Sequence, residues 1–292
     1  MEVLIATRGG IEGLEGRDVG ALAVNGQMVW AVVDGREVWR RAEDWSLVAP
    51  WEGARMTCLA VSGNDVIAGT EEAHVLRLNG QTLGIDESFD RLPERAAWYT
   101  PWGGPAATRS IARDDGTVLV NVHVGGIARS DAGGQWRALV DIDVDVHQVA
   151  VAPDGSLLAA TGAAGFGRSA DGGGTWEWDS NGLHGSYCRA VTVAGDQVLL
   201  TASTGPRGAE GAVYRRPLGE QGDWQRVTEF AKGNIDTSWL RPQENHLLAV
   251  PADVARGLPE RLQELLGYNI YPPFLGYVDG RHPRRVLERQ RS

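Results

Sequence analysis

Short runs of alternating apolar and polar residues recur along most of the chain, and Gly-containing turns separate them. Residues 149–176 (VAVAPDGSLLAATGAAGFGRSADGGGTW) contain a strand, an Asp-Gly turn, a second strand, a Gly-rich break, a third strand, an Asp-Gly-Gly turn and a Trp. Residues 111–136 (IARDDGTVLVNVHVGGIARSDAGGQW) follow the same order. Alternation with a period of two indicates half-buried strands, and Asp-Gly between two apolar runs is a strong hairpin signal. The pattern therefore predicts antiparallel hairpins.

The two units form part of a longer internal repeat. Asp131 and Asp171 are 40 residues apart, as are Trp136 and Trp176. Weaker copies cover residues 21–48, 58–83 and 190–227, and a sixth begins near Ile235. A period of about 40–45 residues with four short strands is the size of a β-propeller blade. We therefore predict an all-β propeller of about six four-stranded blades, with seven as the alternative.

The two ends of the chain depart from the repeat. Residues 1–250 are predicted to form the propeller, with residues 3–11 supplying a strand that pairs into the last blade and closes the ring. Residues 252–266 carry Leu at helical spacing, with Pro259 near the start. Residues 251–292 are thus expected to form a short helix and an irregular tail that complete or cap the last blade.

Composition narrows the classes of partner. The net charge is −10, which disfavours binding to a phosphate backbone, so we expect no nucleic-acid partner. No apolar run is long enough to span a membrane, and the N-terminus lacks the features of a signal peptide. Two cysteines far apart in sequence do not make a disulfide framework, so a cytoplasmic location is expected.

One turn carries a recognisable motif. Residues 169–176 (SADGGGTW) match the Asp-box pattern Ser-x-Asp-x-Gly-x-Thr-Trp in full, and residues 130–136 (SDAGGQW) match it with one residue missing. The chain therefore resembles the BNR/Asp-box propellers, which include sialidases, sortilin-like domains and photosystem assembly factors. It is more closely similar to bacterial proteins described as "glycosyl hydrolase, BNR repeat". The stretches NVHVGGIARSDAGGQW, DVDVHQVAV and GLHGSYCRAV carry this likeness, which covers roughly residues 1–250.

The Asp box itself is interpreted as structural. The short carboxylates of Asp131 and Asp171 can accept hydrogen bonds across their own turns, and the Trp that follows can pack between sheets. The resemblance implies that these turns lie on the outer side, away from the usual propeller pocket. It also suggests a sialidase-like glycoside hydrolase, but the Arg-Ile-Pro motif of sialidases is missing here, which disfavours that activity.

The candidate chemistry lies elsewhere, on one strand face and at the entries of three repeats. Asn121 and His123 alternate along one predicted strand. Asp141, Asp143, Asp145 and His147 alternate in the same way, and His184, Tyr187 and Cys188 begin the next repeat. Asp236 begins the one after. Because the first strands of propeller blades surround the central axis, we expect these polar groups to converge on one pocket.

Two kinds of chemistry fit these residues. His123, His147, His184 and Cys188 are candidate ligands of a divalent transition metal, Zn or Fe. The candidate catalytic residues are His123, His147, Asp145, Tyr187 and Asp236. The non-functional alternatives are hydrogen-bonded histidines in a wet channel and a buried apolar role for Cys188. The three aspartates are expected to form a solvated loop or strand face, since alternation spreads them too widely to bind one Ca²⁺.

The sequence leaves several functions open. The first is an enzyme that acts on a small molecule at an axial, metal-binding pocket. The second is a non-catalytic scaffold that binds a protein partner, and the third is a glycoside hydrolase. Trp98, Tyr99 and Trp102 lie in one loop, where they either stack on a ligand such as a sugar or pack between blades.

Overall fold

The computed structural model describes residues 6, 9–101, 103–114, 116–131, 134–206 and 210–230. Twenty strands form five four-stranded antiparallel sheets, here called blades 1 to 5, and consecutive strands pair within each. Blade 1 contains β1 (Val19–Asn25), β2 (Met28–Val33), β3 (Glu37–Arg41) and β4 (Trp45–Pro50). Blade 2 contains β5 (Met56–Ser62), β6 (Asp65–Thr70), β7 (Val75–Asn79) and β8 (Thr82–Ile85).

The other three blades have the same order. Blade 3 contains β9 (Thr108–Asp114), β10 (Thr117–Val122), β11 (Gly126–Ser130) and β12 (Trp136–Val140). Blade 4 contains β13 (Val146–Val151), β14 (Leu157–Thr161), β15 (Phe166–Ser169) and β16 (Glu177–Asp179). Blade 5 contains β17 (Tyr187–Ala194), β18 (Gln197–Ser203), β19 (Gly211–Pro217) and β20 (Gln225–Phe230). Short helical segments are α1 (Glu87–Asp90), η1 (Pro93–Ala97) and η2 (Ile142–Val144).

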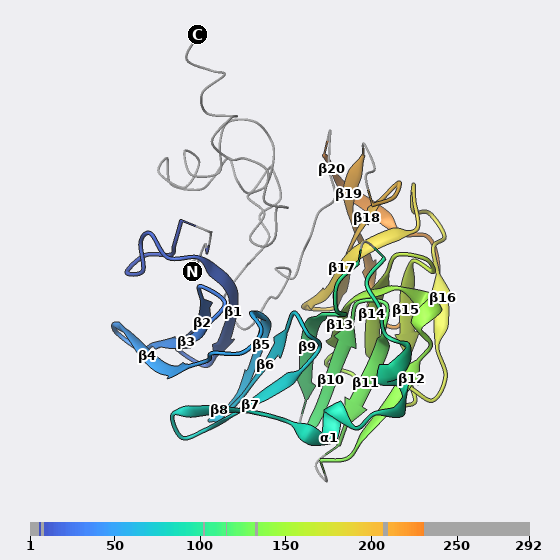
Figure 1. The fold of residues 1–292 in the computed structure, drawn as a ribbon. Helices are drawn as coiled ribbons and strands as arrows, with labels where there is room; N and C mark the ends of the chain where they lie inside the picture. The colour runs from blue at the N-terminus through green and yellow to red at the C-terminus, as the bar shows by residue number, and fades with distance from the viewer. Residues whose placement is uncertain are drawn as a thin grey trace.

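The five blades follow one another around an arc, with the first strand of each on the inner side (Figure 1). The first strands of neighbouring blades contact each other from β1 through β5, β9 and β13 to β17. This arrangement confirms the predicted all-β propeller. The described residues contain five blades, while the sixth that was predicted from Ile235, the helix at 252–266, the tail and most of residues 3–11 lie outside them.

The hairpins form where the turn residues predicted them. Gly26 and Gly63 have φ of 60° and 57°, a conformation that glycine adopts without the strain a Cβ would bring. Asn25 and Met28 close the first hairpin, and Ser62 and Asp65 close the corresponding hairpin of blade 2. Along the strands that these turns connect, buried and exposed side chains alternate only in part, because neighbouring blades cover both faces of most sheets.

The cores lie between the blades, and each draws on two neighbouring sheets. One cluster joins Ile67 and Val75 of blade 2 with Ile111 and Val120 of blade 3. Equivalent clusters join blades 1 and 2, blades 3 and 4, and blades 4 and 5. Burial between sheets is the main source of stability in such a fold, because a lone four-stranded sheet leaves apolar surface in water.

The two repeat tryptophans pack as predicted. Trp136 lies against the cluster between blades 2 and 3, and its ring meets the Phe89 ring edge-on at a centroid distance of 4.9 Å. Trp176 packs against the cluster between blades 3 and 4 and stacks on Trp178 at 5.4 Å. Trp98 also belongs to the packing between blades 2 and 3, which favours the packing interpretation for this residue of the aromatic loop.

The turn at residues 169–176 shows why its Asp is structural. The carboxylate of Asp171 accepts hydrogen bonds from the Thr175 amide (2.9 Å), the Thr175 hydroxyl (2.7 Å) and the Ser169 hydroxyl (2.8 Å). These bonds, led by the one from the Thr175 backbone, lower the pKa of Asp171. The turn joins the third and fourth strands, at the end of the sheet opposite to the start of the first strand.

One local prediction was wrong. Asp141, Asp143 and Asp145 do not alternate along a strand, because η2 occupies residues 142–144. The Asp141 carboxylate accepts a bond from the Asp143 amide, and Asp145 adopts a left-handed conformation with φ 53°. Capping by a short acidic side chain therefore outweighs the period-two pattern at this point. The three carboxylates do not share a strand face.

No helix among the described residues is long and apolar enough to cross a membrane.

The packing between blades 2 and 3 can be tested at Phe89, a fully buried residue of α1. We expect Phe89→Ala to lower the free energy of unfolding by about 3–5 kcal/mol, because it removes a buried ring and leaves a cavity beside Trp136. The control is Tyr99→Ala, since the side chain of Tyr99 is 51% exposed. Urea denaturation followed by tryptophan fluorescence measures both, and equal effects of the two substitutions would contradict the assigned packing.

Candidate functional site

The first strand of every described blade carries a β-bulge near its start. In blades 1 to 4 one residue of the first strand is unpaired just after the strand's first paired residue, and in blade 5 the unpaired residue comes one pair later. In blades 1 to 5 this residue is Gly20, Thr57, Arg109, His147 and Arg189. Bulges redirect side chains and are frequent beside active sites. The fold thus repeats one redirected position around its inner side, and blades 3 to 5 place Arg, His and Arg there.

A second feature of the repeat places the neighbours of these residues. The residue after the second strand donates its amide proton to the carbonyl of the residue two places before the bulge. This bond joins Asp34 to Asp18 (2.6 Å), Glu71 to Arg55 (2.9 Å), His123 to Ala107 (2.8 Å) and Gly162 to Asp145 (2.8 Å). His123 and Gly162 are therefore equivalent in blades 3 and 4. The residues equivalent to Asp145 in the other blades lie at the same end of their sheets.

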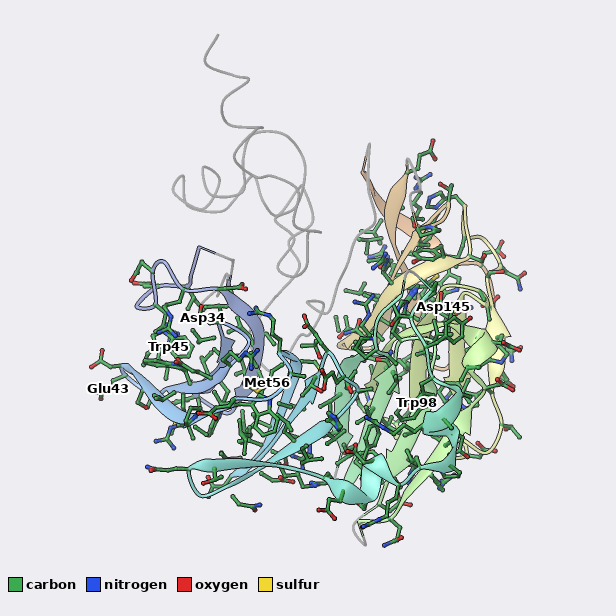
Figure 2. The ribbon with its side chains drawn as sticks, viewed as in Figure 1. Asp34, Glu43, Trp45, Met56, Trp98 and Asp145 are labelled. Carbon is green, nitrogen blue, oxygen red and sulfur yellow. The ribbon has the colours of Figure 1, made fainter. Side chains whose placement is uncertain are left out.

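His123, Asp145 and His147 meet at this end, between blades 3 and 4. Asp145 directly precedes β13, and Figure 2 marks it at the upper end of blade 4 in that view. Its carboxylate lies 3.4 Å from Nε2 of His147 and 3.7 Å from Nε2 of His123. One ligand atom from each residue lies within 4.8 Å of the other two. Ligand atoms of one tetrahedral zinc lie about 3.4 Å apart, given bonds of about 2.1 Å, so this set could hold a metal ion.

The backbone of blade 5 sets the orientation of His147. Nδ1 of His147 lies 2.6 Å from the carbonyl oxygen of Cys188. Because a carbonyl oxygen has no proton to give, Nδ1 is the donor, and in the neutral ring the lone pair is on Nε2. Nε2 is buried and has no hydrogen-bond partner among the described residues, although it faces Asp145. A carbonyl behind an imidazole is the arrangement that orients a metal-binding histidine.

The protonation of the other two groups also suits ligation. Burial, followed by the charge of Arg109, lowers the pKa of His123 to about 4, so this ring is neutral near pH 7. Burial alone would raise the pKa of Asp145, but the contact with His147 and the charge of Arg109 lower it. A neutral imidazole and an ionised carboxylate are the forms that bind metal ions.

Gly162 makes room for the cluster. A Cβ added at this residue would lie 2.2 Å from Oδ2 of Asp145 and 2.9 Å from Cε1 of His147. Any side chain at Gly162, the position that His123 fills in blade 3, would therefore displace two members of the cluster. The site therefore depends on the His123 side chain in blade 3 and on a glycine, Gly162, at the equivalent position of blade 4.

Three further residues surround the cluster. The Tyr187 ring packs 4.8 Å from the His147 ring, and burial raises the pKa of the Tyr187 hydroxyl, which keeps its proton near neutral pH. The guanidinium of Arg189 lies 5.3 Å from the centroid of the Tyr187 ring. Arg109 acts electrostatically on His123, Asp145 and Tyr187. The cluster therefore has a phenol and two cations beside it.

The structure separates the other predicted ligands from the cluster. The thiol of Cys188 belongs to the apolar core between blades 4 and 5, and burial raises its pKa to about 12. Only the carbonyl of Cys188 reaches His147. His184 bonds through Nδ1 to the Tyr214 hydroxyl (2.7 Å). Asp236 lies outside the described residues. The metal set predicted from His123, His147, His184 and Cys188 is thus reduced to its first two members, with Asp145 as the third.

Asn121 has a structural role next to the site. It is fully buried, bonds to the Ser110 hydroxyl and donates from Nδ2 to the Val146 carbonyl (2.7 Å). These bonds join β10 to β9 and to the start of β13. Gln148 follows two residues later in the same strand. Asn121 therefore holds blade 3 against the strand that carries His147.

Sequence reasoning missed Arg109, Arg189 and Gly162. The two arginines lie one bulge position before and after His147 in the repeat, so a residue-level alignment of the first strands could have identified them. That alignment requires the bulge, which strict alternation does not reveal. Gly162 is one of many glycines in the chain, and only the distances to Asp145 and His147 give it a role.

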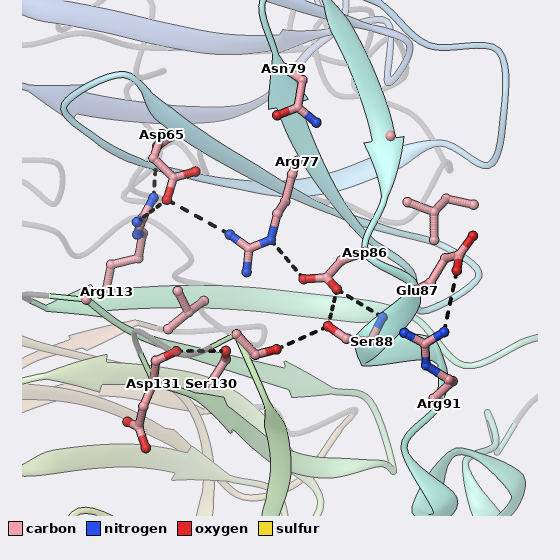
Figure 3. A pocket seen from close by; sticks show the side chains of 15 residues that line it. Asp65, Arg77, Asn79, Asp86, Glu87, Ser88, Arg91, Arg113, Ser130 and Asp131 are labelled. Atoms are coloured by element: carbon pink, nitrogen blue, oxygen red, sulfur yellow. Dashed lines mark hydrogen bonds and ion pairs between the residues drawn. The ribbon is translucent and has the colours of Figure 1, made fainter.

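A hollow lies between blades 2 and 3, with a volume of about 730 Å³ (Figure 3). Its charged groups bind each other: Arg77 contacts Asp86 (2.8 Å), and Arg113 contacts Asp65 (2.5 Å). Asp86 also accepts hydrogen bonds from Ser88 and from Nε1 of Trp136 (3.1 Å). These groups are engaged in joining the two blades, so we assign this hollow to blade packing.

Comparison with known proteins supports the fold. No family model matches the chain. The solved structure "YCF48 bound to D1 peptide" shares 16% identity over 73% of this chain and 68% of its own, with a TM-score of 0.51. Virginiamycin B lyase from Staphylococcus aureus, as an inactive histidine-to-alanine variant with quinupristin, shares 15% identity over 75% and 72%, with a TM-score of 0.54. The GH74 xyloglucanase from Xanthomonas campestris shares 18% over 72% and 38%, with a TM-score of 0.55.

These neighbours are a lyase, a hydrolase and a peptide-bound protein, and at such low identity the likeness establishes the propeller fold alone.

The buried state of the cysteines can be tested by their reactivity. Because the pKa of Cys188 is raised to about 12, its thiol stays protonated at pH 8, and both Cys188 and Cys58 are buried. We expect negligible reaction with Ellman's reagent at pH 8 in the native protein and two thiols per chain after denaturation. Rapid reaction of one thiol in the native protein, assigned by Cys58→Ala and Cys188→Ala, would refute this placement.

Proposed function

We propose that the protein is an enzyme that acts on a small molecule at a divalent transition-metal site formed by His123, Asp145 and His147. The observation that carries the proposal is the orientation of His147. Its Nδ1 donates to the Cys188 carbonyl, so in the neutral ring the lone pair of Nε2 faces the Asp145 carboxylate at 3.4 Å. Two electron-rich atoms repel each other, and a shared cation removes the repulsion. Two imidazoles and one carboxylate suit Zn or Fe.

The surrounding residues give such a site its chemistry. A metal with three protein ligands retains room for water or substrate and acts as a Lewis acid. Tyr187, whose hydroxyl keeps its proton, lies beside His147 and is placed to donate a hydrogen bond or a proton to a bound substrate. Blade packing excludes water from the histidines, which are nearly fully buried.

The alternatives have less support. The described cluster contains one carboxylate, whereas most glycoside hydrolases act through a pair, so the glycosidase that the Asp-box resemblance suggests is not our choice. The Asp-box turn itself, with Asp171 fully engaged, fits the BNR-type propellers. A peptide-binding scaffold is the second candidate, because the similar YCF48 structure holds a peptide. Buried, mutually facing titratable groups favour the enzyme.

The proposed metal centre predicts which substitutions lower the affinity for a metal ion. We expect the wild-type chain to bind one Zn²⁺ or Co²⁺, and His123→Ala and His147→Ala to lower its affinity at least 100-fold, because each removes one of three ligands. Equilibrium dialysis with metal analysis measures the binding. His184→Ala is the matched control, since His184 bonds to Tyr214 instead of facing the cluster. Retention of full metal affinity in both ligand variants, or none in the wild type, would disprove the centre.

The room that Gly162 leaves can be tested separately. We expect Gly162→Ala to weaken metal binding about 10- to 100-fold, the range seen when the support of a ligand is disturbed, because its methyl group would displace Asp145 and His147. Gly84→Ala is the control, as a Cβ there meets nothing within 4 Å. Circular dichroism establishes that both variants are folded. Equal metal affinity in the two would show that the close approach at Gly162 does not shape the site.

A further inference from the structure

Strained backbone lies at and beside the cluster. Among the described residues other than glycine, φ is positive at Asp34, Ala73, Val124 and Asp145. Asp145 belongs to the cluster, and Val124 directly follows His123. Asp tolerates this conformation, but it strains a β-branched residue such as Val124, which has φ 45°. Such strain persists only where the surrounding structure holds it, and it is frequent at functional sites.

Val124 is the third residue of the turn that joins β10 to β11. The Gly125 amide donates to the Val122 carbonyl (2.9 Å) and closes the turn, in which His123 is the second residue. A turn with positive φ at its third residue alone is of type II, which normally has Gly or Asn at that place. With Val124 there, the strain favours opening of the turn.

Residues 98–99, which belong to the connection between blades 2 and 3, lie against this turn. The Tyr99 amide donates to the Val124 carbonyl (3.4 Å). Trp98 packs on the turn, since a Cβ added at Gly125 would lie 3.0 Å from Cγ of Trp98. Trp98 is itself packed against the core cluster between blades 2 and 3. These two residues, here called the clamp, therefore oppose the opening that the strain favours.

We propose that the clamp and Val124 position His123 for the metal. The clamp keeps the turn closed, and the closed turn keeps the His123 amide on the Ala107 carbonyl (2.8 Å) and the His123 ring beside Asp145. This rests on the proposed function for its metal, and it gives a positioning role to residues that are not ligands. Because an open turn removes one ligand, metal binding and opening of the turn oppose each other by the same factor.

The hydrogen bond of the clamp can be removed with little other change. Trp98 has φ −70° and ψ 140°, which a following proline permits, so Tyr99→Pro loses the N–H and retains the direction of the chain. Tyr99→Ala is the matched control, because it loses the same exposed side chain and retains the N–H. We expect Tyr99→Pro to bind Zn²⁺ roughly three- to tenfold more weakly than Tyr99→Ala, as measured by equilibrium dialysis of the full-length protein.

A second substitution tests the strain itself. Glycine at residue 124 keeps positive φ without a clamp, so Val124→Gly should abolish the effect of Tyr99→Pro on Zn²⁺ affinity. Val124→Ala is the control, since it removes the same buried methyl groups and retains the strained φ. Ala73→Gly relieves a positive φ in blade 2, away from His123. In both control backgrounds, Tyr99→Pro should still weaken Zn²⁺ binding.

Exchange of the Gly125 amide hydrogen, followed by NMR, reports on the turn without any metal. We expect this exchange to be faster in Tyr99→Pro than in Tyr99→Ala, and to be slow again when Val124→Gly is added. Zn²⁺ should slow it in the wild type. Circular dichroism and thermal midpoints establish that all variants are folded.

The outcomes distinguish the two proposals. Absence of Zn²⁺ binding by the wild type would overturn the metal centre and the positioning role together. Zn²⁺ binding by the wild type, with equal affinities and equal Gly125 exchange in Tyr99→Pro and Tyr99→Ala, would overturn the positioning role alone. The same holds if the loss in Tyr99→Pro persists unchanged with Val124→Gly, because the strain at residue 124 would then have no part in it.

Discussion

Each four-stranded sheet of this protein has two apolar faces, and only a neighbouring sheet can cover them. The core clusters between blades follow from that constraint, and so does the inner position of the first strands. Once the first strands lie side by side, the residues at their starts gather at one end of the inner side. The location of the candidate site is therefore a consequence of burying apolar surface, and its chemistry is a consequence of which residues stand at the repeated positions.

The backbone of the bulge repeats from blade to blade, but the side chain at the bulge position varies. The backbone of the first strand is nearly the same in each blade, yet the unpaired residue ranges from Gly20 to His147 and Arg189. At this end of blades 1 and 2 the arginines contact carboxylates, while blades 3 to 5 place Arg109 and Arg189 near a His–Asp–His cluster. The asymmetry of charge arises from side chains alone, since the hydrogen bonds of the backbone repeat from blade to blade.

Sequence patterns predicted much of the fold because they reflect local chemistry. Asn25-Gly26 and Asp154-Gly155 occupy hairpin turns, and Trp136 and Trp176 pack between blades as expected. The approach of His123 to His147 was also predicted, from a polar strand face at His123 and a blade entry at His147. Asp141 and Asp143 were misassigned because a capping bond formed η2 in place of a strand. The roles of Arg109, Arg189 and Gly162 depend on a bulge and on close contacts between blades, neither of which leaves a simple sequence signal.

The bond between His147 and the Cys188 carbonyl crosses from blade 4 to blade 5, and His123 reaches the same cluster from blade 3. Three consecutive repeats must therefore dock before the cluster exists. An intermediate with well-formed but undocked sheets would have native strand content and no competent centre. Metal binding would then occur only after blades 3 to 5 have docked. A bound metal would stabilise the contacts between these three blades more than it stabilises any single sheet.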